Sequence, residues 1–475
     1  MSDPVRIGQL LGPVLAELRE DNSLDRWIDQ VRSLRGCTAP IHLAGERCRV
    51  DASTGEILST YSTEENEPRG ALLVRCKNRR VSVCASCSEE YRADAYQLIK
   101  AGITGGSKGV PSSVGVHPRV FVTLTAPSFG PVHRGPGKDG TTQPCHPRRS
   151  GLSCTKYHRS DDPLIGQPLD PESYDYVQHV LWQAHSGELW RRFIIHLRHH
   201  LASAAGLTRT EFAQRVRVSY AKVAEFQARG VVHFHAVIRL DGARGPSSWP
   251  LPPVWASLDM LIAAVHSAVR ATSLEVTVGD ECHRLAWGEQ YDVRPIGEFG
   301  PEHGALSDTA VAGYIAKYAT KAAEEAGGLD RRLTDITHLD PEQVRPHVAR
   351  LIETCWRLGN RHVYPELEYL NLRKWAHMLG FRGHFLTKSR SYSTTLGALR
   401  QARADYSAGY PWDPETWTPT RQDDQDDEST LVLSDWRYLG QGFTPGELAL
   451  VCVITGRSPT TKEAHDKEAH DEVFP

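Results

Sequence analysis

The stretch AEFQARGVVHFHAVIRL, residues 224–240, constrains the fold of this chain more than any other. It predicts a β-hairpin whose turn is Ala228-Arg229-Gly230, with glycine where a left-handed residue is required. Side chains alternate between the two faces of a strand, so His233 and His235 should share one face. Two histidines separated by a single residue on a strand therefore constrain both the expected sheet and the expected functional site.

The hairpin register sets Glu225 across from His233, so that a carboxylate joins the two imidazoles on one patch of sheet. Two imidazoles and a carboxylate suit a divalent metal ion. An ordinary strand with surface or core histidines is the alternative, because the chain has 22 histidines and such a pair also arises by chance.

A second pattern lies downstream in AVAGYIAKYATKAAEEAGG, residues 310–328, which predicts a helix. Ser307 or Asp308 can cap its start and Gly327-Gly328 can end it. Four side chains at i, i+3, i+4 and i+7 share one face; these are Tyr314, Lys317, Tyr318 and Lys321. An amphipathic helix with extended lysines is the alternative interpretation.

A third stretch, RVFVTLTAPSFG at 119–130, is an apolar strand running into Thr-Leu-Thr. Together with the His-x-His strand and the Tyr-x-x-Lys helix, in this order, it resembles the HUH endonucleases, which include rolling-circle replication initiators and relaxases. The CKNRRVSVCASCS and LRKWAHMLGFRGHFLTKSRSYSTTLGALR stretches add a wider resemblance to the RepSA-like replication initiators of actinomycete plasmids. That resemblance covers most of the chain, from about Cys37 to the mid-450s.

The resemblance implies an α+β fold with a central antiparallel sheet of the HUH endonuclease type and helices on one face. An N-terminal zinc-binding module and helical insertions should accompany it. Residues 119–128 and 230–240 should be adjacent strands, with Tyr314 near His235. The insertion 130–215 should pack outside the sheet, although 172–205 has the pattern of a strong helix. We also expect a helix at 254–271, two strands within 274–296 and helix around 341–359.

The implied activity is site-specific nicking and rejoining of single-stranded plasmid origin DNA through a 5′-phosphotyrosine intermediate. Tyr314 best fits the position of the nucleophile, and Tyr318 could serve as a second one. Lys317 would neutralise phosphate charge or help to orient the phosphate, and Lys321 would contact backbone phosphate. The catalytic metal on Glu225, His233 and His235 would be Mg²⁺ or Mn²⁺, with Thr123 and Thr125 nearby in supporting roles. Origin DNA, single-stranded or in a hairpin, is the expected partner, with a host helicase and polymerase as further partners.

The N-terminal region contains several cysteines with the spacing of metal ligands. Cys37, Cys76, Cys84 and Cys87 predict a structural zinc site, with Cys48 as the rival of Cys37 and free buried thiols as the alternative. A second metal site is open to question, because LDPESYDY lacks the cysteines that similar initiators carry at this place. Its candidate ligands are Cys145, His146, Cys154 and His158.

Origin recognition should involve the cysteine module and the basic stretch 373–403, where local charge matters more than the net charge of −3. The candidate phosphate contacts there are Arg373, Lys374, Arg382, Lys388 and Arg390. Interleaved aromatic residues could stack on bases; they are Trp375, Phe381, Phe385 and Tyr392.

A chain of 475 residues exceeds one hydrophobic core, so several modules are expected. The predicted segments are an N-terminal helical segment at 1–36, the cysteine module at 37–100, the catalytic domain at 119–328, a basic helical region at 329–410, and an acidic linker with a C-terminal tail at 411–475. The last twenty residues are expected to be disordered. A cytoplasmic location is expected, since no apolar run spans a bilayer and no signal pattern opens the chain.

Three other functions remain open from the sequence. A conjugative relaxase or a transposase would use the same chemistry, but these proteins usually carry a helicase or another partner domain, and the Gly-x-x-x-x-Gly-Lys phosphate-binding loop does not occur here. A zinc-dependent DNA-binding regulator would carry the same motifs without activity. A metal hydrolase unrelated to DNA would have an open metal site with no tyrosine helix beside it.

Overall fold

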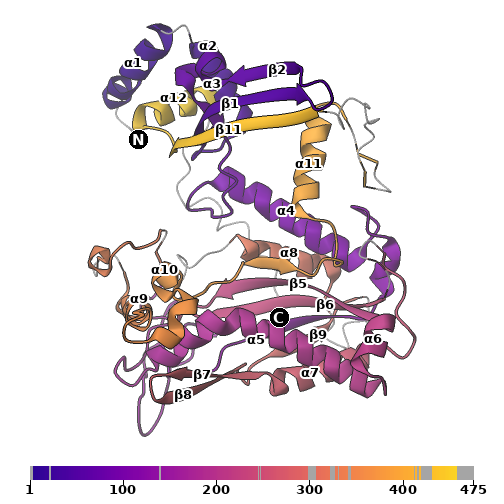
Figure 1. The fold of residues 1–475 in the computed structure, drawn as a ribbon. Helices are drawn as coiled ribbons and strands as arrows, with labels where there is room; N and C mark the ends of the chain where they lie inside the picture. The colour runs from indigo at the N-terminus through magenta and orange to yellow at the C-terminus, as the bar shows by residue number, and fades with distance from the viewer. Residues whose placement is uncertain are drawn as a thin grey trace. The chain divides into compact units, whose positions relative to one another are not determined.

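The computed structural model describes residues 4–20, 23–137, 141–243, 245, 248–297, 306–320, 327–329, 331–340, 344–410, 412–413, 417–418 and 430–456. The chain divides into two compact units (Figure 1). The first unit contains Met1–Ala93, Asp405–Pro411 and Pro419–Phe474, and the second contains Asp94–Ala404 and Trp412–Thr418. The predicted segments 1–36, 37–100 and 411–475 therefore contribute mainly to one unit, where the sequence suggested three separate ones. The acidic run at 421–428 and the last nineteen residues lie outside the described part of the chain.

The first unit is built on an antiparallel sheet with the order β11-β1-β2, in which β3 also pairs with β1. Its strands are β1 (Ile41–Asp51), β2 (Ile57–Ser62), β3 (Leu72–Val74) and β11 (Thr430–Gln441). β1 pairs with β11 along its whole length, from Ile41 opposite Gln441 to Asp51 opposite Thr430. The prediction of a C-terminal tail was wrong here, because β11 is an integral strand of the N-terminal sheet.

Helices from both ends of the chain form the apolar core of this unit. They are α1 (Pro4–Glu20), α2 (Leu24–Ser33) and α12 (Pro445–Thr455), and the short α3 (Thr63–Asn66) follows β2. Leu18, Trp27, Val31, Leu450 and Val451 form one buried cluster. A capping box fixes the start of α12, because the Thr444 side chain accepts from the Glu447 N–H and Glu447 binds back to Thr444. The first unit therefore depends on sequence from both ends.

The second unit contains an antiparallel five-stranded sheet with the order β10-β5-β6-β4-β9. Its strands are β4 (Arg119–Leu124), β5 (Val216–Phe226), β6 (Val232–Gly242), β9 (Asp292–Pro295) and β10 (Leu386–Lys388). The predicted pairing of the Thr-Leu-Thr strand with the His-x-His strand is confirmed by β4 and β6. Residues 274–296 hold three strands where two were predicted: β7 (Ser273–Val278) and β8 (Glu281–Ala286) form a separate hairpin, and β9 joins the main sheet.

One face of this sheet carries the main core of the unit. α5 (Tyr176–Ala204) and α7 (Leu258–Ala271) lie along it (Figure 1). Phe234 of β6 points to this face, with its ring 6.0 Å from that of Trp190 on α5 and 5.7 Å from that of Trp287. Lys222 of β5 is on the same face, and its ammonium nitrogen is 3.9 Å from the centre of the Phe234 ring. The prediction that 130–215 packs outside the sheet was therefore wrong for α5, which is a central part of the core.

The opposite face is covered by α8 (Asp308–Ala319) and the C-terminal part of α4 (Ala85–Thr104). The prediction of helices on one face was incomplete, because this second face needs cover too. It carries a buried ionic network in which Arg239 Nε donates to Asp241 Oδ1 at 2.6 Å. His117 Nδ1 lies 2.8 Å from the same carboxylate, and both partners are fully buried. Buried charges of this kind require paired, hydrogen-bonded partners, which the covering elements provide.

Shorter elements complete the second unit. They are α6 (Arg209–Arg215), α9 (Pro346–Leu358), α10 (Leu372–Trp375), α11 (Leu396–Ser407), whose last three residues belong to the first unit, and 3-10 turns at Ser112–Val116, Ile336–His338, Pro365–Leu370 and Ala376–Met378. The predicted helices at 172–205, 254–271 and 341–359 correspond to α5, α7 and α9. Among the described residues, none of the helices is long and apolar enough to cross a membrane.

Candidate active site and metal centres

The β5–β6 hairpin brings three potential ligands together. Glu225 of β5 is directly opposite His233 of β6, as the sequence predicted. Glu225 Oε2 is 2.6 Å from His233 Nε2 and 3.0 Å from His235 Nε2, and the two imidazole nitrogens are 3.2 Å apart. Because side chains alternate along the strand, both histidines lie on the face opposite Phe234.

The spacing of these atoms fits a metal ion. Ligands about 2.1 Å from an octahedral metal lie about 3 Å from their neighbours, close to the three distances observed here. Burial alone would raise the pKa of Glu225, but hydrogen bonds from His233 and His235 outweigh it and lower the pKa to about 2. Glu225 is therefore a carboxylate at neutral pH, the form that binds metal. The donor set, one oxygen and two nitrogens, suits Mn²⁺ or Zn²⁺ at least as well as Mg²⁺.

Two residues of β4 orient the ring of His235. Thr123 Oγ1 is 3.0 Å from His235 Nδ1, so the hydroxyl can bind that nitrogen while Nε2 faces Glu225. The ring of Phe121 is stacked on His235, with the centres 5.7 Å apart and the planes within 6°. Thr125 has a different environment, because its hydroxyl donates to the backbone oxygen of Gln290. Only Thr123 of the two predicted threonines contacts a candidate ligand through a described hydrogen bond.

Helix α8 is fixed at its N-terminus. The Ser307 hydroxyl accepts from the backbone N–H of Ala310 at 3.2 Å, so the predicted capping role is confirmed for Ser307. Arg119, at the start of β4, forms an ion pair with Asp308 in the first helical turn, at 3.1 Å. These contacts attach the helix to the strand beside the histidines. The helix ends at Ala319, and Lys321 lies outside the described residues.

The helix presents two tyrosines to the hairpin. The Tyr314 hydroxyl is 3.3 Å from His235 Nε2, and its ring contacts Phe121 edge-on. The Tyr318 ring is 4.6 Å from that of Tyr314 and 5.7 Å from that of His235. Burial raises the pKa of Tyr314, and the neighbouring Tyr318 and Glu225 raise it further, so the isolated phenol is protonated at neutral pH. Lys317, between the two tyrosines in sequence, is exposed.

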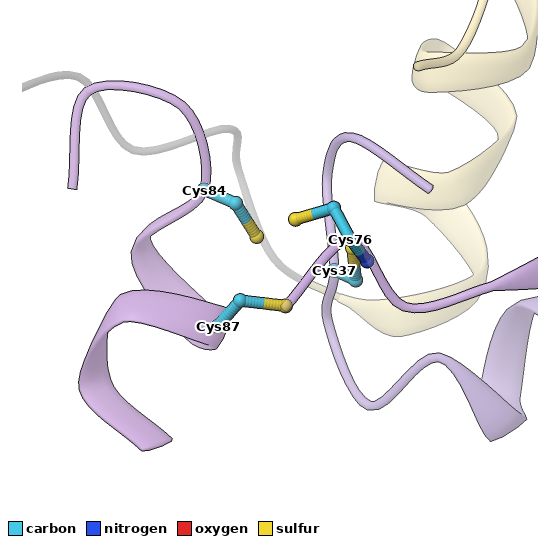
Figure 2. Close-up of side chains that lie close together, drawn as sticks. All are labelled: Cys37, Cys76, Cys84 and Cys87. Carbon is cyan, nitrogen blue, oxygen red and sulfur yellow. The ribbon is translucent and has the colours of Figure 1, made fainter. Parts of the chain in front are cut away.

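A second cluster consists of four cysteines in the first unit. Cys37, Cys76, Cys84 and Cys87 have sulfur atoms within 4.8 Å of one another. Figure 2 shows the four side chains directed into the same small space. Backbone N–H groups donate to two of the sulfurs, from Cys76 to Cys37 Sγ at 3.4 Å and from Asn78 to Cys76 Sγ at 3.5 Å.

Cys84 precedes α4 and Cys87 lies in its first turn, so the Cys-x-x-Cys spacing turns both thiols to one side. Four sulfurs in this arrangement can hold a tetrahedral metal such as zinc. Cys48, the rival of Cys37, lies in β1 and is not part of the cluster. The structure thus selects Cys37 among the two alternatives that the sequence left open.

A third cluster lies in the segment between β4 and α5. It contains Cys145, Cys154 and His158, as the sequence suggested, but His133 takes the place expected for His146. The sequence contains no local signal for His133, because it precedes Cys145 by twelve residues and Cys154 by twenty-one. The candidate ligands do not include any residue of LDPESYDY, and whether the cluster binds a metal stays a prediction.

The basic stretch is only partly available to a ligand. Arg373, Lys374, Arg382 and Arg390 are exposed. Lys388 is different, because its ammonium group donates to the backbone oxygens of Arg390 at 3.1 Å and Ser393 at 2.9 Å. Of the four aromatic residues predicted to stack on bases, three are buried; these are Phe381, Phe385 and Tyr392. That part of the prediction was wrong, since Phe381 and Phe385 belong to the main apolar core and the buried Tyr392 hydroxyl donates to the backbone oxygen of Ile99 at 3.1 Å.

Together, the fold and these clusters define a mixed α/β protein with antiparallel sheets and groups of cysteines and histidines that can bind a metal such as zinc. Residues 23–455 match the RepSA family model, described as "Replication initiator protein, pSAM2", and the chain belongs to this family. A curated replication initiator protein from Streptomyces ambofaciens is 45% identical over 476 residues, covering 99% of this chain and 97% of the relative. No solved structure matches the chain. Family membership supports a role as a plasmid replication initiator that acts on origin DNA.

Proposed function

We propose that this replication initiator nicks and rejoins single-stranded origin DNA with Tyr314 as its nucleophile. The observation that carries the proposal is the 3.3 Å distance between the Tyr314 hydroxyl and His235 Nε2, beside Glu225 and His233. A tyrosine is a weak nucleophile at neutral pH, so it needs a polarised phosphate and an in-line approach. The ligands of the β5–β6 hairpin are suited to polarising the phosphate, and α8 is suited to aligning the Tyr314 oxygen for in-line attack.

In the proposed reaction, the Tyr314 oxygen attacks the scissile phosphorus and the bond from phosphorus to the 3′-oxygen breaks. The phenolic proton is lost to solvent, and the 3′-oxygen takes up a proton and leaves as a hydroxyl. The products are a 5′-phosphotyrosine and a 3′-end that a host polymerase can extend once a helicase opens the duplex. A Mg²⁺ or Mn²⁺ ion bound by Glu225, His233 and His235 would neutralise charge on the non-bridging phosphate oxygens. Attack by a 3′-hydroxyl on the phosphotyrosine reverses the step and rejoins DNA.

Tyr318 and Lys317 take supporting parts in this proposal. The Tyr318 ring contacts both Tyr314 and His235, so a modest shift of the substrate would bring the second phenol to the phosphate. Tyr318 is therefore proposed as the second nucleophile for repeated rounds. The exposed ammonium group of Lys317 would bind a phosphate oxygen of the incoming strand. Lys321, outside the described residues, is proposed to contact the phosphate backbone further along.

Origin DNA is proposed to follow the exposed cations Arg373, Lys374, Arg382 and Arg390. The logarithm of the DNA association constant falls with the logarithm of the salt concentration, and each lost contact with single-stranded phosphate should reduce the magnitude of that slope by about 0.7. Replacing Arg373 and Lys374 by alanine should then reduce the magnitude of the slope by about 1.4. Lys388→Ala is the matched control, because this ammonium group is held by backbone oxygens and should leave the slope unchanged.

The decisive experiment is covalent capture. The full chain is incubated with Mn²⁺ and labelled single-stranded oligonucleotides that tile the origin of its replicon, and adducts are separated under denaturing conditions. Wild type should form an adduct that peptide mapping assigns to Tyr314 or Tyr318, and Tyr314→Phe with Tyr318→Phe should form none. Tyr406→Phe is the control, since this tyrosine is 75% exposed and lies outside the site.

The single variants distinguish the two tyrosines. Loss of the first adduct in Tyr314→Phe alone, with Tyr318→Phe retaining it, supports the assigned order. If the wild-type chain binds the origin tightly but gives no adduct on any oligonucleotide, the nicking proposal fails. The alternative of a DNA-binding regulator without activity is then the better account.

A further inference from the structure

The segment between β4 and α5 contains a cluster of four metal-type ligands that takes no part in the proposed reaction. His133, Cys145, Cys154 and His158 offer ligand atoms that all lie within 4.8 Å of one another. His133 Nδ1 is 3.1 Å from His158 Nε2, Cys145 Sγ is 3.7 Å from His133 Nδ1, and Cys154 Sγ is 3.5 Å from His158 Nε2. Cys145 and His158 are almost completely buried. Two thiols and two imidazoles in this arrangement are the Cys₂His₂ donor set of tetrahedral zinc sites.

The surroundings of the cluster are also those of a metal site. The backbone N–H of Arg134 donates to Cys145 Sγ at 3.2 Å, a contact that metal-bound cysteines commonly accept from the backbone. Asp162 Oδ2 accepts from His158 Nδ1 at 2.6 Å, which leaves His158 Nε2 free to face the other ligands. A carboxylate behind a ligating histidine is the usual way in which proteins fix the tautomer and the ring orientation.

The backbone fixes the two cysteines relative to each other. His146 and Cys154 form an antiparallel bridge with N–O distances of 2.7 and 2.9 Å, and Cys145 N donates to Lys156 O at 2.9 Å. This short hairpin fixes the backbone at both cysteines, and their sulfur atoms lie within 4.8 Å of each other. His146 also approaches Cys145, with Nδ1 3.2 Å from Sγ, but it is not part of the group of four. The geometry therefore assigns the fourth position to His133.

The same segment is packed against the turn of the β5–β6 hairpin. His133 exchanges backbone hydrogen bonds with Gly166 and Gln167, at 2.9 and 2.8 Å. Gly166 has a φ of +84°, and a Cβ placed there would lie 2.3 Å from the backbone of Ala228 in the hairpin turn. Only glycine allows this approach. The Arg345 guanidinium bridges the two, donating to the oxygens of Ile165 and Ala228 at 3.1 Å each.

We propose that His133, Cys145, Cys154 and His158 bind a structural zinc ion that fixes this segment against the hairpin turn Ala228–Gly230. The zinc ion is distinct from that of the four-cysteine cluster. Without it, the short hairpin would keep the hydrogen bonds from Arg134 to Cys145 but would lose the cross-link of both cysteines to His133 and His158. The contact of Gly166 with Ala228 would then loosen. The four residues are positioning residues for the strands that carry Glu225 and His233, and zinc binding itself does not depend on the proposed nicking.

Zinc content of the purified full chain is the first test. His233→Ala serves as the background, so that the hairpin ligands do not retain zinc. In this background Cys154→Ser and His158→Ala should each lose about one zinc equivalent. His146→Ala and the exposed Cys282→Ser should lose none. An unchanged zinc content in Cys154→Ser overturns the proposal, and loss of zinc in His146→Ala with retention in His133→Ala overturns the assignment of the fourth ligand.

X-ray absorption of the same His233→Ala background tests the site with all four ligands intact, in case these variants fold poorly. Zinc in both clusters gives an average of about three sulfur and one nitrogen ligands per ion, whereas zinc in the four-cysteine cluster alone gives about four sulfurs. The second value, or a disulfide between Cys145 and Cys154 found by mass spectrometry, rules the zinc site out.

The positioning role has its own readout in limited trypsin digestion. Arg229 lies in the hairpin turn, half-buried, with its guanidinium bound to the backbone oxygens of Pro127 and Ala126 at 2.9 and 3.2 Å. Cleavage after Arg229 should become at least about tenfold faster in Cys154→Ser and stay at the wild-type rate in His146→Ala. Equal rates in all three proteins would show that zinc does not fix the turn, even if it binds.

Discussion

Lys222 gives a quantitative test of how the core of the second unit is built. Its side chain is on the apolar face of β5, the residue is 5% exposed, and no hydrogen bond or ion pair reaches its ammonium group within the described part of the chain. Burial lowers the pKa of Lys222 from 10.5 to about 7. The folded protein therefore favours the neutral amine, while the unfolded chain keeps the proton until much higher pH.

The sign of the effect follows from proton binding. Between pH 7 and 10.5 the unfolded chain binds a proton at Lys222 that the folded chain has lost, so the free energy of unfolding rises with pH. The slope approaches about 1.4 kcal/mol per pH unit. Allowing for half-titration at pH 7, the gain from pH 7 to pH 9 is about 2 kcal/mol. The ring of Phe234 beside the ammonium group stabilises the charged form, so this value is an upper limit.

The assay compares urea denaturation of wild type and Lys222→Met at pH 7, 8 and 9. Methionine keeps the length of the side chain without the charge, so the variant should be more stable than wild type at pH 7. That advantage should shrink by about 2 kcal/mol by pH 9, because only wild type gains from deprotonation. Lys374→Met, at an exposed position, should show no such trend. A difference between wild type and Lys222→Met that stays constant with pH would refute the reasoning.

Three further predictions concern the sheet face that carries the histidines. Asp241→Asn should destabilise the chain by about 3 to 5 kcal/mol in urea denaturation, because it leaves the buried Arg239 guanidinium without its counter-charge; a loss below about 1 kcal/mol would contradict this. Thr123→Val should weaken Mn²⁺ binding at the hairpin by about 10- to 100-fold in calorimetric titration, because His235 loses the partner of Nδ1; unaltered affinity would mean that the hydroxyl does not orient the ring. Glu225→Gln should weaken the same binding by at least about 100-fold, because the anionic ligand is lost, and wild-type affinity in this variant would exclude Glu225 as a ligand.

Much of the second unit could be predicted because its signals are local. The register of Glu225 with His233 follows from a short turn, and the face shared by His233 and His235 follows from strand alternation. The helix cap at Ser307 is likewise contained within a few residues, as is the Cys-x-x-Cys pair of the first unit. Such patterns depend on backbone geometry alone and need no knowledge of the rest of the chain.

The features that were missed depend on distant partners or on burial. β11 is exposed along most of both faces, so it has no alternating apolar pattern to reveal a strand, and only its pairing with β1 defines it. Phe381 and Tyr392 look like part of a basic, aromatic surface in sequence, yet both are buried because the surrounding chain folds over them. His133 joins its cluster through a turn of the segment that no spacing rule describes.

The pairing of β1 with β11 has a consequence for biosynthesis. A ribosome delivers β1 nearly four hundred residues before its partner, whereas every strand of the β10-β5-β6-β4-β9 sheet lies within Asp94–Ala404. The second unit can therefore fold during translation, whereas the edge of β1 stays unpaired until β11 has been synthesised. A prematurely terminated chain would expose that edge. An unpaired strand edge can pair with other chains and aggregate, and it is open to proteases.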